Sequence, residues 1–234
     1  MVKRAPKLLV SIDGPAGAGK SSVSRLLAKR LGYRYLDTGA LYRAIGLLAV
    51  EANVSPEDVV GLAGICETAK ISLTHNRVHI GTRDISTEIR QPEISEVASK
   101  VSAHPAVRAA LLGLQRRLGA SGAAVIEGRD IGTVVFPDAD IKIFLDASIE
   151  ERGRRRYIQL KDTNARKISL KQIIRDIAQR DKRDSERDAA PLRPAADAVY
   201  MDSTKLTREQ VVDRMVELVH AHASIGSQKE KGRP

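Results

Sequence analysis

The stretch GPAGAGKS at residues 14–21 decides the fold. It matches the pattern G-x-x-x-x-G-K-[ST], in which small residues allow backbone N–H groups to wrap a phosphate chain. The apolar run KLLVSI precedes it at residues 7–12, and a helical pattern follows at residues 20–31 and ends at Gly32. A buried strand, a glycine-rich loop and a helix in this order predict a nucleoside-triphosphate site at the positive end of the helix.

The loop itself assigns the first site residues. Lys20 is expected to reach the β- and γ-phosphates, and the hydroxyl of Ser21 to ligate the Mg²⁺ that accompanies ATP. The loop identifies a nucleotide site but no reaction. The residues expected around ATP are Gly14, Pro15, Ala16, Gly17, Ala18, Gly19, Lys20, Ser21 and Ser22.

Strand and helix patterns continue beyond this loop. Four more apolar runs are typical of buried strands, at residues 33–36, 123–126, 141–145 and 197–201. Helical patterns occupy residues 37–52 and 207–222. Strands that alternate with helices predict an α/β fold, with a parallel five-stranded sheet flanked by helices.

Three regions depart from this alternation. Residues 70–89 alternate apolar and polar side chains in short runs, which predicts two or three small antiparallel strands. Residues 92–118 are helical, with a break at His104-Pro105. Residues 148–187 form a long, heavily charged helical region with a soft loop at 162–167.

Composition narrows the class of partner. The chain of 234 residues carries a net charge of +10, which favours anionic partners. Aromatic residues make up only 3%, too few for the stacking surface of a single-strand nucleic-acid binder. One cysteine, Cys66, rules out an internal disulfide and a cysteine-based zinc site. No apolar run reaches about 18 residues, so we expect a cytoplasmic protein.

Polar segments follow two of the predicted core strands and indicate an acceptor site. DTGALYR at 37–43 follows the second strand, and Arg129-Asp130 follow the third, so both meet at the carboxyl edge of the sheet. Arg43 is placed to hold a second phosphate, and Arg108 lies on the preceding helix. Converging arginines suit a bidentate grip on phosphate, although any one of them could form a surface salt bridge. A base-reading N-K-x-D motif of GTPases is missing, and Asp146 is the nearest candidate for the strand-end carboxylate of a mechanical ATPase.

With these segments in order, the sequence resembles the bacterial cytidylate kinases. The resemblance is carried by GPAGAGKSS, DTGALYR, STEIR, VSAHPAVR, EGRDIGTVVFPDA, KIFLDAS and RDKRDSERDAAPL, from Lys7 to about residue 220. It implies a transferase of pyrimidine nucleotide metabolism that moves the γ-phosphate of ATP to CMP or dCMP. The expected products are ADP and CDP or dCDP.

The resemblance also implies the acceptor residues. Thr38 stands where many members have Ser, and its hydroxyl is expected to help read cytosine. Asp184 resembles a carboxylate that reads the sugar. The residues implied around CMP are Asp37, Thr38, Arg43, Ser99, Arg108, Arg129, Asp130, Arg180, Asp184 and Arg187.

The charged region 152–193 is expected to form a lid. It holds fourteen basic and six acidic residues, and phosphoryl transfer depends on cations that are positioned over the phosphates. A helix–loop–helix lid can close over both nucleotides and exclude water. Lys20, Arg155, Arg156, Arg180 and Arg187 are expected to be catalytic, and no catalytic His is expected because the acceptor phosphate is already ionised.

These inferences give a domain plan. We expect an ATP-binding core at 1–60, 120–150 and 194–222, a monophosphate-binding region with the β insert at 61–119, a lid at 151–193, and a disordered tail at 223–234. The expected partners are ATP, CMP or dCMP, and Mg²⁺, with neither nucleic acid nor membrane, and the expected state is a monomer.

Two alternatives remain open from the residues alone. A small-molecule kinase of the shikimate type would share the phosphate loop but lack the strand insert and EGRDIGTVVFPDA. A basic RNA-binding protein that uses ATP as a switch would show RNA affinity with a steep dependence on salt. The ranking of CMP, dCMP and UMP, and the preferred phosphate donor, also remain open.

Overall fold

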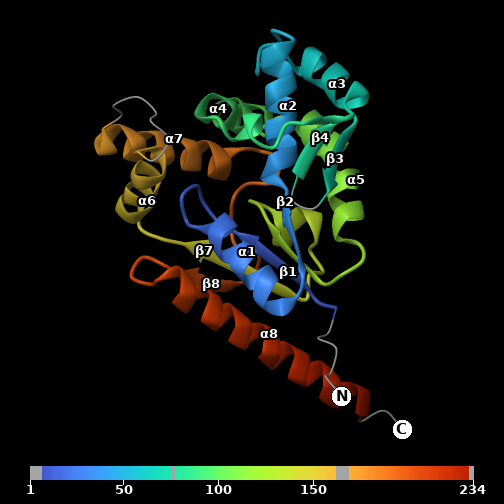
Figure 1. Ribbon diagram of the computed structural model, residues 1–234, viewed down its shortest axis with the longest axis vertical. Coiled ribbons are helices and arrows are strands. Elements are labelled where there is room, and N and C mark those ends of the chain that lie inside the picture. Colours follow the sequence, from blue (N-terminus) through green and yellow to red (C-terminus); the bar gives the residue numbers. More distant parts are fainter. Residues whose placement is uncertain (1–6, 75–76, 162–168, 232–234) are drawn as a thin grey trace.

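A parallel five-stranded sheet forms the centre of the molecule (Figure 1). The computed structural model describes residues 7–74, 77–161 and 169–231. The strand order is β2-β6-β1-β7-β8. The strands are β1 (Leu9–Asp13), β2 (Arg34–Asp37), β6 (Ala124–Glu127), β7 (Ile141–Asp146) and β8 (Val199–Asp202). The predicted fold class is confirmed, and strand bounds shift by one or two residues from the sequence estimates.

The register brings polar strand ends together. Asp37 at the end of β2 lies opposite Glu127 at the end of β6, and Ile12 of β1 lies opposite the same Glu127. The phosphate loop leaves the central strand β1 beside these two carboxylates. Carboxyl ends of parallel strands share one edge of the sheet, so this edge gathers the candidate site.

Helices α1 (Lys20–Leu31) and α8 (Arg208–Lys231) cover one face of the sheet. Val23 and Leu27 of α1 pack with Val212 and Met215 of α8 in an aliphatic core that includes Ile12. The prediction of a disordered tail from residue 223 is wrong for most of that stretch, because α8 continues to Lys231. Between residues 223 and 231 the sequence has one glycine and no proline to stop a helix.

A second group of helices forms the upper part of the molecule in Figure 1. Its members are α2 (Gly39–Glu51), α3 (Val59–Thr68), α4 (Pro92–Val101) and α5 (Pro105–Gly119). Leu41 and Ile45 of α2 share a core with Leu62, Val101 and Val107 of the other three. By packing, α2 therefore belongs with the region after residue 60, whereas the sequence plan assigned it to the ATP-binding core. The predicted break at His104-Pro105 separates α4 from α5.

The predicted strand insert is a three-stranded antiparallel sheet, β3-β4-β5. It comprises β3 (Ile71–Thr74), β4 (Arg77–Ile80) and β5 (Arg83–Asp84). Gly81 turns the chain between β4 and β5 with a φ of 58°, which favours glycine. A 3₁₀ turn, η1 (Glu88–Arg90), leads from this sheet to α4.

The predicted lid contains two helices that pack together, α6 (Ile149–Lys161) and α7 (Leu170–Glu186). They stand beside the phosphate loop at one end of the sheet (Figure 1). The loop predicted at 162–167 lies outside the described residues. Within the described part of the chain, no helix is both long and apolar enough to traverse a membrane.

Candidate active site

The phosphate loop is shaped by glycines that other residues cannot replace. Gly14 has a φ of 147°, and a Cβ there would lie 1.9 Å from the carbonyl oxygen of Leu145. Gly17 has a φ of 78°, and its Cβ would lie 3.1 Å from the Cβ of Arg152. The loop is therefore held between β7 and the start of α6, with its backbone open to a phosphate chain.

The side chain of Lys20 folds against the phosphate loop that precedes it. Its Nζ donates hydrogen bonds to the carbonyl oxygens of Gly14 and Pro15, each at 2.7 Å. Burial and the neighbouring Arg129 lower the pKa of Lys20 well below its ordinary value. An anionic phosphate beside this amine favours its charged form, so the site is prepared for a polyphosphate.

Glu127 is the strand-end carboxylate nearest the loop. Its Oε2 accepts a hydrogen bond from the Ser21 hydroxyl at 3.0 Å, and its Oε1 accepts one from the Tyr35 hydroxyl. Burial and the charge of Asp37 raise the pKa of Glu127. Oxygen ligands of this kind suit Mg²⁺, which commonly takes one or two protein groups and completes its shell with phosphate and water. Ser21 and Glu127 therefore fit the ion that ATP brings.

From the sequence, Asp146 is named only as the nearest candidate for the strand-end carboxylate of a mechanical ATPase, and Glu127 is assigned no role. Asp146 instead accepts hydrogen bonds from the Ala147 N–H at 2.7 Å and the Tyr200 hydroxyl at 2.8 Å. The sequence feature that could have identified Glu127 is its position as the last residue of a buried strand. In the sheet this strand, β6, lies on one side of β1, whereas β7, which ends at Asp146, lies on the other side.

Asp13, at the end of β1, organises the turn after β6. Its two carboxylate oxygens accept hydrogen bonds from the N–H groups of Ile131 and Gly132 at 2.8 and 2.7 Å. Burial raises the pKa of Asp13 to about 6, although these two N–H groups oppose the rise. They begin the π-helical turn η2 (Ile131–Val135), so Asp13 fixes the backbone that follows Arg129 and Asp130.

A largely buried ion pair lies among the residues expected to bind the phosphate acceptor, a region called the acceptor side below. Arg43 lies 2.6 Å from Asp37, and Arg90 of η1 approaches the same carboxylate to 3.9 Å. Burial pushes the pKa of Asp37 upward, but Arg43 and Arg90 outweigh it and hold the pKa below its ordinary value. Arg90, which sequence reasoning had not included, therefore belongs to the same charge cluster.

A second ion pair joins α5 to the end of β6. Arg108 pairs with Asp130, donates to the Ser102 carbonyl at 3.2 Å and lies over the Tyr42 ring at 5.5 Å. A cavity of about 200 Å³ lies against Tyr42, Arg108 and Asp130. Thr38 donates its hydroxyl to the Glu127 carbonyl at 2.8 Å.

Asp184 of α7 connects the lid to this side. It lies 3.1 Å from Nε of Arg129 and 4.0 Å from Nε of Arg180. Burial, followed by the charge of Arg129, lowers the pKa of Arg180 to about 10. Burial and Arg108 likewise lower the pKa of Arg187, whose Nε donates to the Ala190 carbonyl at 2.7 Å.

Several buried polar atoms on this side lack a hydrogen-bond partner among the described residues. They include Oγ of Ser99, the Tyr42 hydroxyl and guanidinium nitrogens of Arg43, Arg180, Arg183 and Arg187. A buried donor without a partner costs about 1–3 kcal/mol. Such a set indicates that a polar, anionic ligand completes the site.

The comparisons with known proteins agree with this geometry. The family model for cytidylate kinase matches residues 10–221. The chain belongs to the cytidylate kinase family. A cytidylate kinase of Geobacter sulfurreducens is 50% identical over 91% of this chain and 92% of its own length. A cytidylate kinase of Citrifermentans bemidjiense is 48% identical over 94% and 95%. A solved structure of an uncharacterised protein from Eubacterium ventriosum has a TM-score of 0.51 at 12% identity, covering 91% of this chain and 98% of that one. That last likeness concerns the fold alone.

In this member of the cytidylate kinase family, Arg155 and Arg156, two lid arginines expected to be catalytic, have different hydrogen-bond partners. Arg155 is fixed against the phosphate loop, with hydrogen bonds to the carbonyl of Ala18 at 3.2 Å and the carbonyl of Ser203 at 2.7 Å. Arg156 donates to Gln159 at 2.9 Å, and burial followed by the charge of Arg43 lowers its pKa. Arg155 is thus attached to the phosphate loop, whereas Arg156 is bonded within α6.

Proposed function

We propose that this protein transfers the γ-phosphate of ATP to CMP or dCMP and releases ADP and CDP or dCDP. The observation that carries the proposal is the set of buried, unpartnered groups of Ser99, Arg43, Arg180 and Arg187, which stands across from a phosphate loop with Lys20 and Ser21. One site for a polyphosphate and a second for a phosphorylated acceptor are what phosphoryl transfer requires.

The transfer itself needs positioning and charge. An oxygen of the CMP phosphate forms the new bond to the γ-phosphorus, the bond from that phosphorus to the β,γ-bridging oxygen breaks, and ADP leaves with the electron pair. The attacking oxygen is already ionised, so no general base is required. Lys20 and the lid arginines Arg155, Arg156, Arg180 and Arg187 stabilise the charge on the transferred group.

The acceptor assignments follow the resemblance to the cytidylate kinases. Arg43 holds the CMP phosphate, and Arg180, Asp184 and Arg187 contact the phosphate and the sugar, with Asp184 on the sugar. Thr38 helps to read cytosine, Ser99 and Arg108 contact the base or its phosphate, and Arg129 with Asp130 lies at the base and ribose. The support for these roles is that the residues follow the carboxyl ends of strands or lie on helices beside them. Thr38 and Arg43 come from the start of α2, Arg129 and Asp130 from the loop after β6, and the others from α4, α5 and α7 with its C-cap.

Mg²⁺ enters the proposal with ATP. When bound, the ion neutralises charge on the β- and γ-phosphates. Ser21 supplies the ligating hydroxyl, and Glu127 holds that hydroxyl in place. The proposal also includes a monomer that works in the cytoplasm on small nucleotides rather than on nucleic acid.

A steady-state assay tests the function. ADP release is measured with ATP and Mg²⁺ against CMP, dCMP, UMP, AMP and shikimate. The expected result is turnover that depends on CMP or dCMP. Much faster turnover with UMP or AMP contradicts the substrate assignment, and turnover with shikimate alone contradicts the acceptor class.

A further inference from the structure

Arg152 belongs to the basic lid by sequence, and its guanidinium contacts several segments of the chain, including Asp146 at the end of β7, 3.8 Å from its Nε. It lies in the first turns of α6 and is only 8% exposed. Its Nε donates to the Ala147 carbonyl at 2.9 Å, and its Nη1 donates to the Ala16 carbonyl at 3.1 Å. The same Nη1 pairs with the carboxylate of Asp181 on α7. The guanidinium therefore joins α6, α7 and the phosphate loop.

Asp181 completes this connection from the other helix. While its Oδ2 pairs with Arg152, its Oδ1 accepts a hydrogen bond from the N–H of Ala16 at 3.4 Å. Ala16 thus offers its N–H to one member of the pair and its carbonyl to the other. Close packing at Gly17, where a Cβ would lie 3.1 Å from the Cβ of Arg152, leaves α6 little room to shift against the loop.

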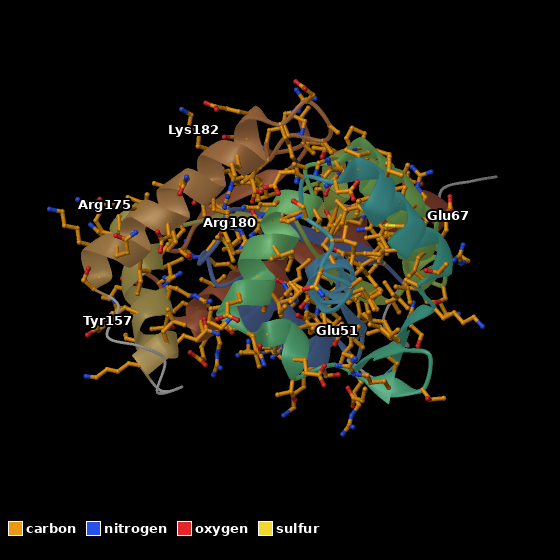
Figure 2. All side chains as sticks on the ribbon, turned by 90° about the horizontal axis from the view of Figure 1, so that it is seen from above. Glu51, Glu67, Tyr157, Arg175, Arg180 and Lys182 are labelled. Carbon is orange, nitrogen blue, oxygen red and sulfur yellow. The ribbon has the colours of Figure 1, made fainter. Side chains whose placement is uncertain are left out.

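The same stretch of α7 also carries acceptor-side residues. Arg180 precedes Asp181, and Asp184 follows one turn later and holds Arg129 at 3.1 Å. Figure 2 shows Arg180 directed toward the body of the protein, while Arg175 and Lys182 of the same helix extend away from it. A displacement of α7 relative to the phosphate loop therefore moves Arg180 and Asp184 relative to bound ATP.

We propose that Arg152 and Asp181 form a latch that sets the lid helices against the phosphate loop and thereby positions Arg180 and Asp184 for transfer. The two latch residues are positioning residues, because they touch the loop and the helices rather than the reacting atoms. This inference rests on the proposed function, since it concerns the alignment of acceptor with donor.

The test is Asp181→Asn, which retains the side-chain volume but removes the charge and one of the two acceptor oxygens. Asp176→Asn is the matched control, because Asp176 is exposed on the same helix α7 and undergoes the same chemical change. A misplacement of about 1 Å can slow transfer about 100-fold. We expect kcat/KM for CMP at saturating ATP to fall about 10- to 100-fold in Asp181→Asn and to stay at the wild-type value in Asp176→Asn.

Binding and stability measurements separate a latch from a merely structural contact. By calorimetry, the Kd of ATP without CMP should not weaken in Asp181→Asn, and the thermal midpoint should stay near that of Asp176→Asn. Arg152→Lys keeps the charge but loses the forked geometry, and should reproduce the fall in kcat/KM. The double variant should lose no more than the more impaired single variant, because the two residues act as one unit.

Each other outcome overturns the latch. Equal kcat/KM in Asp181→Asn and Asp176→Asn shows that the contact does not position anything. Weaker ATP binding by Asp181→Asn in the absence of CMP places Asp181 in the ATP site itself. A fall in kcat/KM that is accounted for by the unfolded fraction of Asp181→Asn makes the contact structural only. A wild-type protein without CMP-dependent turnover contradicts the proposed function instead, so the two failures are distinguishable.

Discussion

Replacement of Glu127 by Gln should remove one of the two hydrogen bonds that this carboxylate accepts from hydroxyl groups. Glu127 accepts the Ser21 hydroxyl on one oxygen and the Tyr35 hydroxyl on the other. Gln has the same shape but only one accepting oxygen. Tyr35 is buried, whereas Ser21 is exposed and can turn to water. The remaining oxygen therefore stays with Tyr35, and Ser21 loses its charged partner.

The size of the effect follows from that lost contact. A hydrogen bond to a charged group contributes about 1.5–3 kcal/mol, and each ~1.4 kcal/mol corresponds to a factor of ten in rate. We expect kcat/KM for ATP to fall about 10- to 100-fold. The Mg²⁺ concentration at half-maximal turnover should rise by a similar factor, because partners of metal ligands tune metal affinity by about 10- to 100-fold.

The assay is ADP release at saturating CMP, with ATP and Mg²⁺ varied independently. Glu67→Gln is the control, since Glu67 is exposed on α3 and undergoes the same chemical change. Its activity should stay within about twofold of the wild type. The reasoning is refuted if the two variants behave alike, or if Glu67→Gln loses more activity and more Mg²⁺ affinity than Glu127→Gln.

Three further perturbations test other parts of the site. Lys20→Met removes a preorganised cation from the phosphate loop, and kcat should fall about 100- to 1,000-fold in the ADP-release assay while the thermal midpoint is retained; an undiminished kcat contradicts the role of Lys20. Asp184→Asn should raise the KM for CMP about tenfold or more, with the Kd of ATP alone unchanged by calorimetry, because a charged acceptor of Arg129 is lost; an unchanged KM removes Asp184 from the acceptor site. Asp13 has a pKa of about 6 in the folded chain against 3.8 as the reference, so its contribution to the free energy of unfolding is fully present below pH 3.8 and is lost as the pH rises through 6, by about 3 kcal/mol. Asp13→Asn should therefore gain stability relative to the wild type between pH 4 and pH 7.5 in urea unfolding, and a constant difference across that range contradicts the pKa shift.

The predictable part of the fold rests on local patterns. The strand, loop and helix around residues 14–21 and the break at His104-Pro105 both depend on residues a few positions apart. Backbone preferences and short apolar runs act over that distance, so the sequence predicts these elements well. The helical end of α8 was missed because a polar composition is also typical of disordered tails, although Gln228, Lys229, Glu230 and Lys231 are good helix formers.

The parts of the site that escaped sequence analysis depend on pairings between distant residues. Glu127 gains its place from the parallel register with β2 and β1, which no local pattern encodes. Asp13 reaches the Ile131 N–H across more than a hundred residues, and Arg152 meets Asp181 across two helices. Charge composition alone assigns Arg152 to a phosphate-binding surface, whereas burial and hydrogen bonding assign it to the lid's attachment.

The arrangement of charge explains which arginines respond most to a phosphate. Three arginines of the acceptor side are paired with carboxylates: Arg43 with Asp37, Arg108 with Asp130 and Arg129 with Asp184. Arg180 and Arg187 lack such close partners for part of their guanidiniums, and burial lowers the pKa of each. A lowered arginine pKa means that the surroundings disfavour its charge, and an anion placed beside it reverses that effect. An anionic ligand placed beside Arg180 and Arg187 therefore stabilises their charge more than it stabilises the charge of the three arginines that already have carboxylate partners.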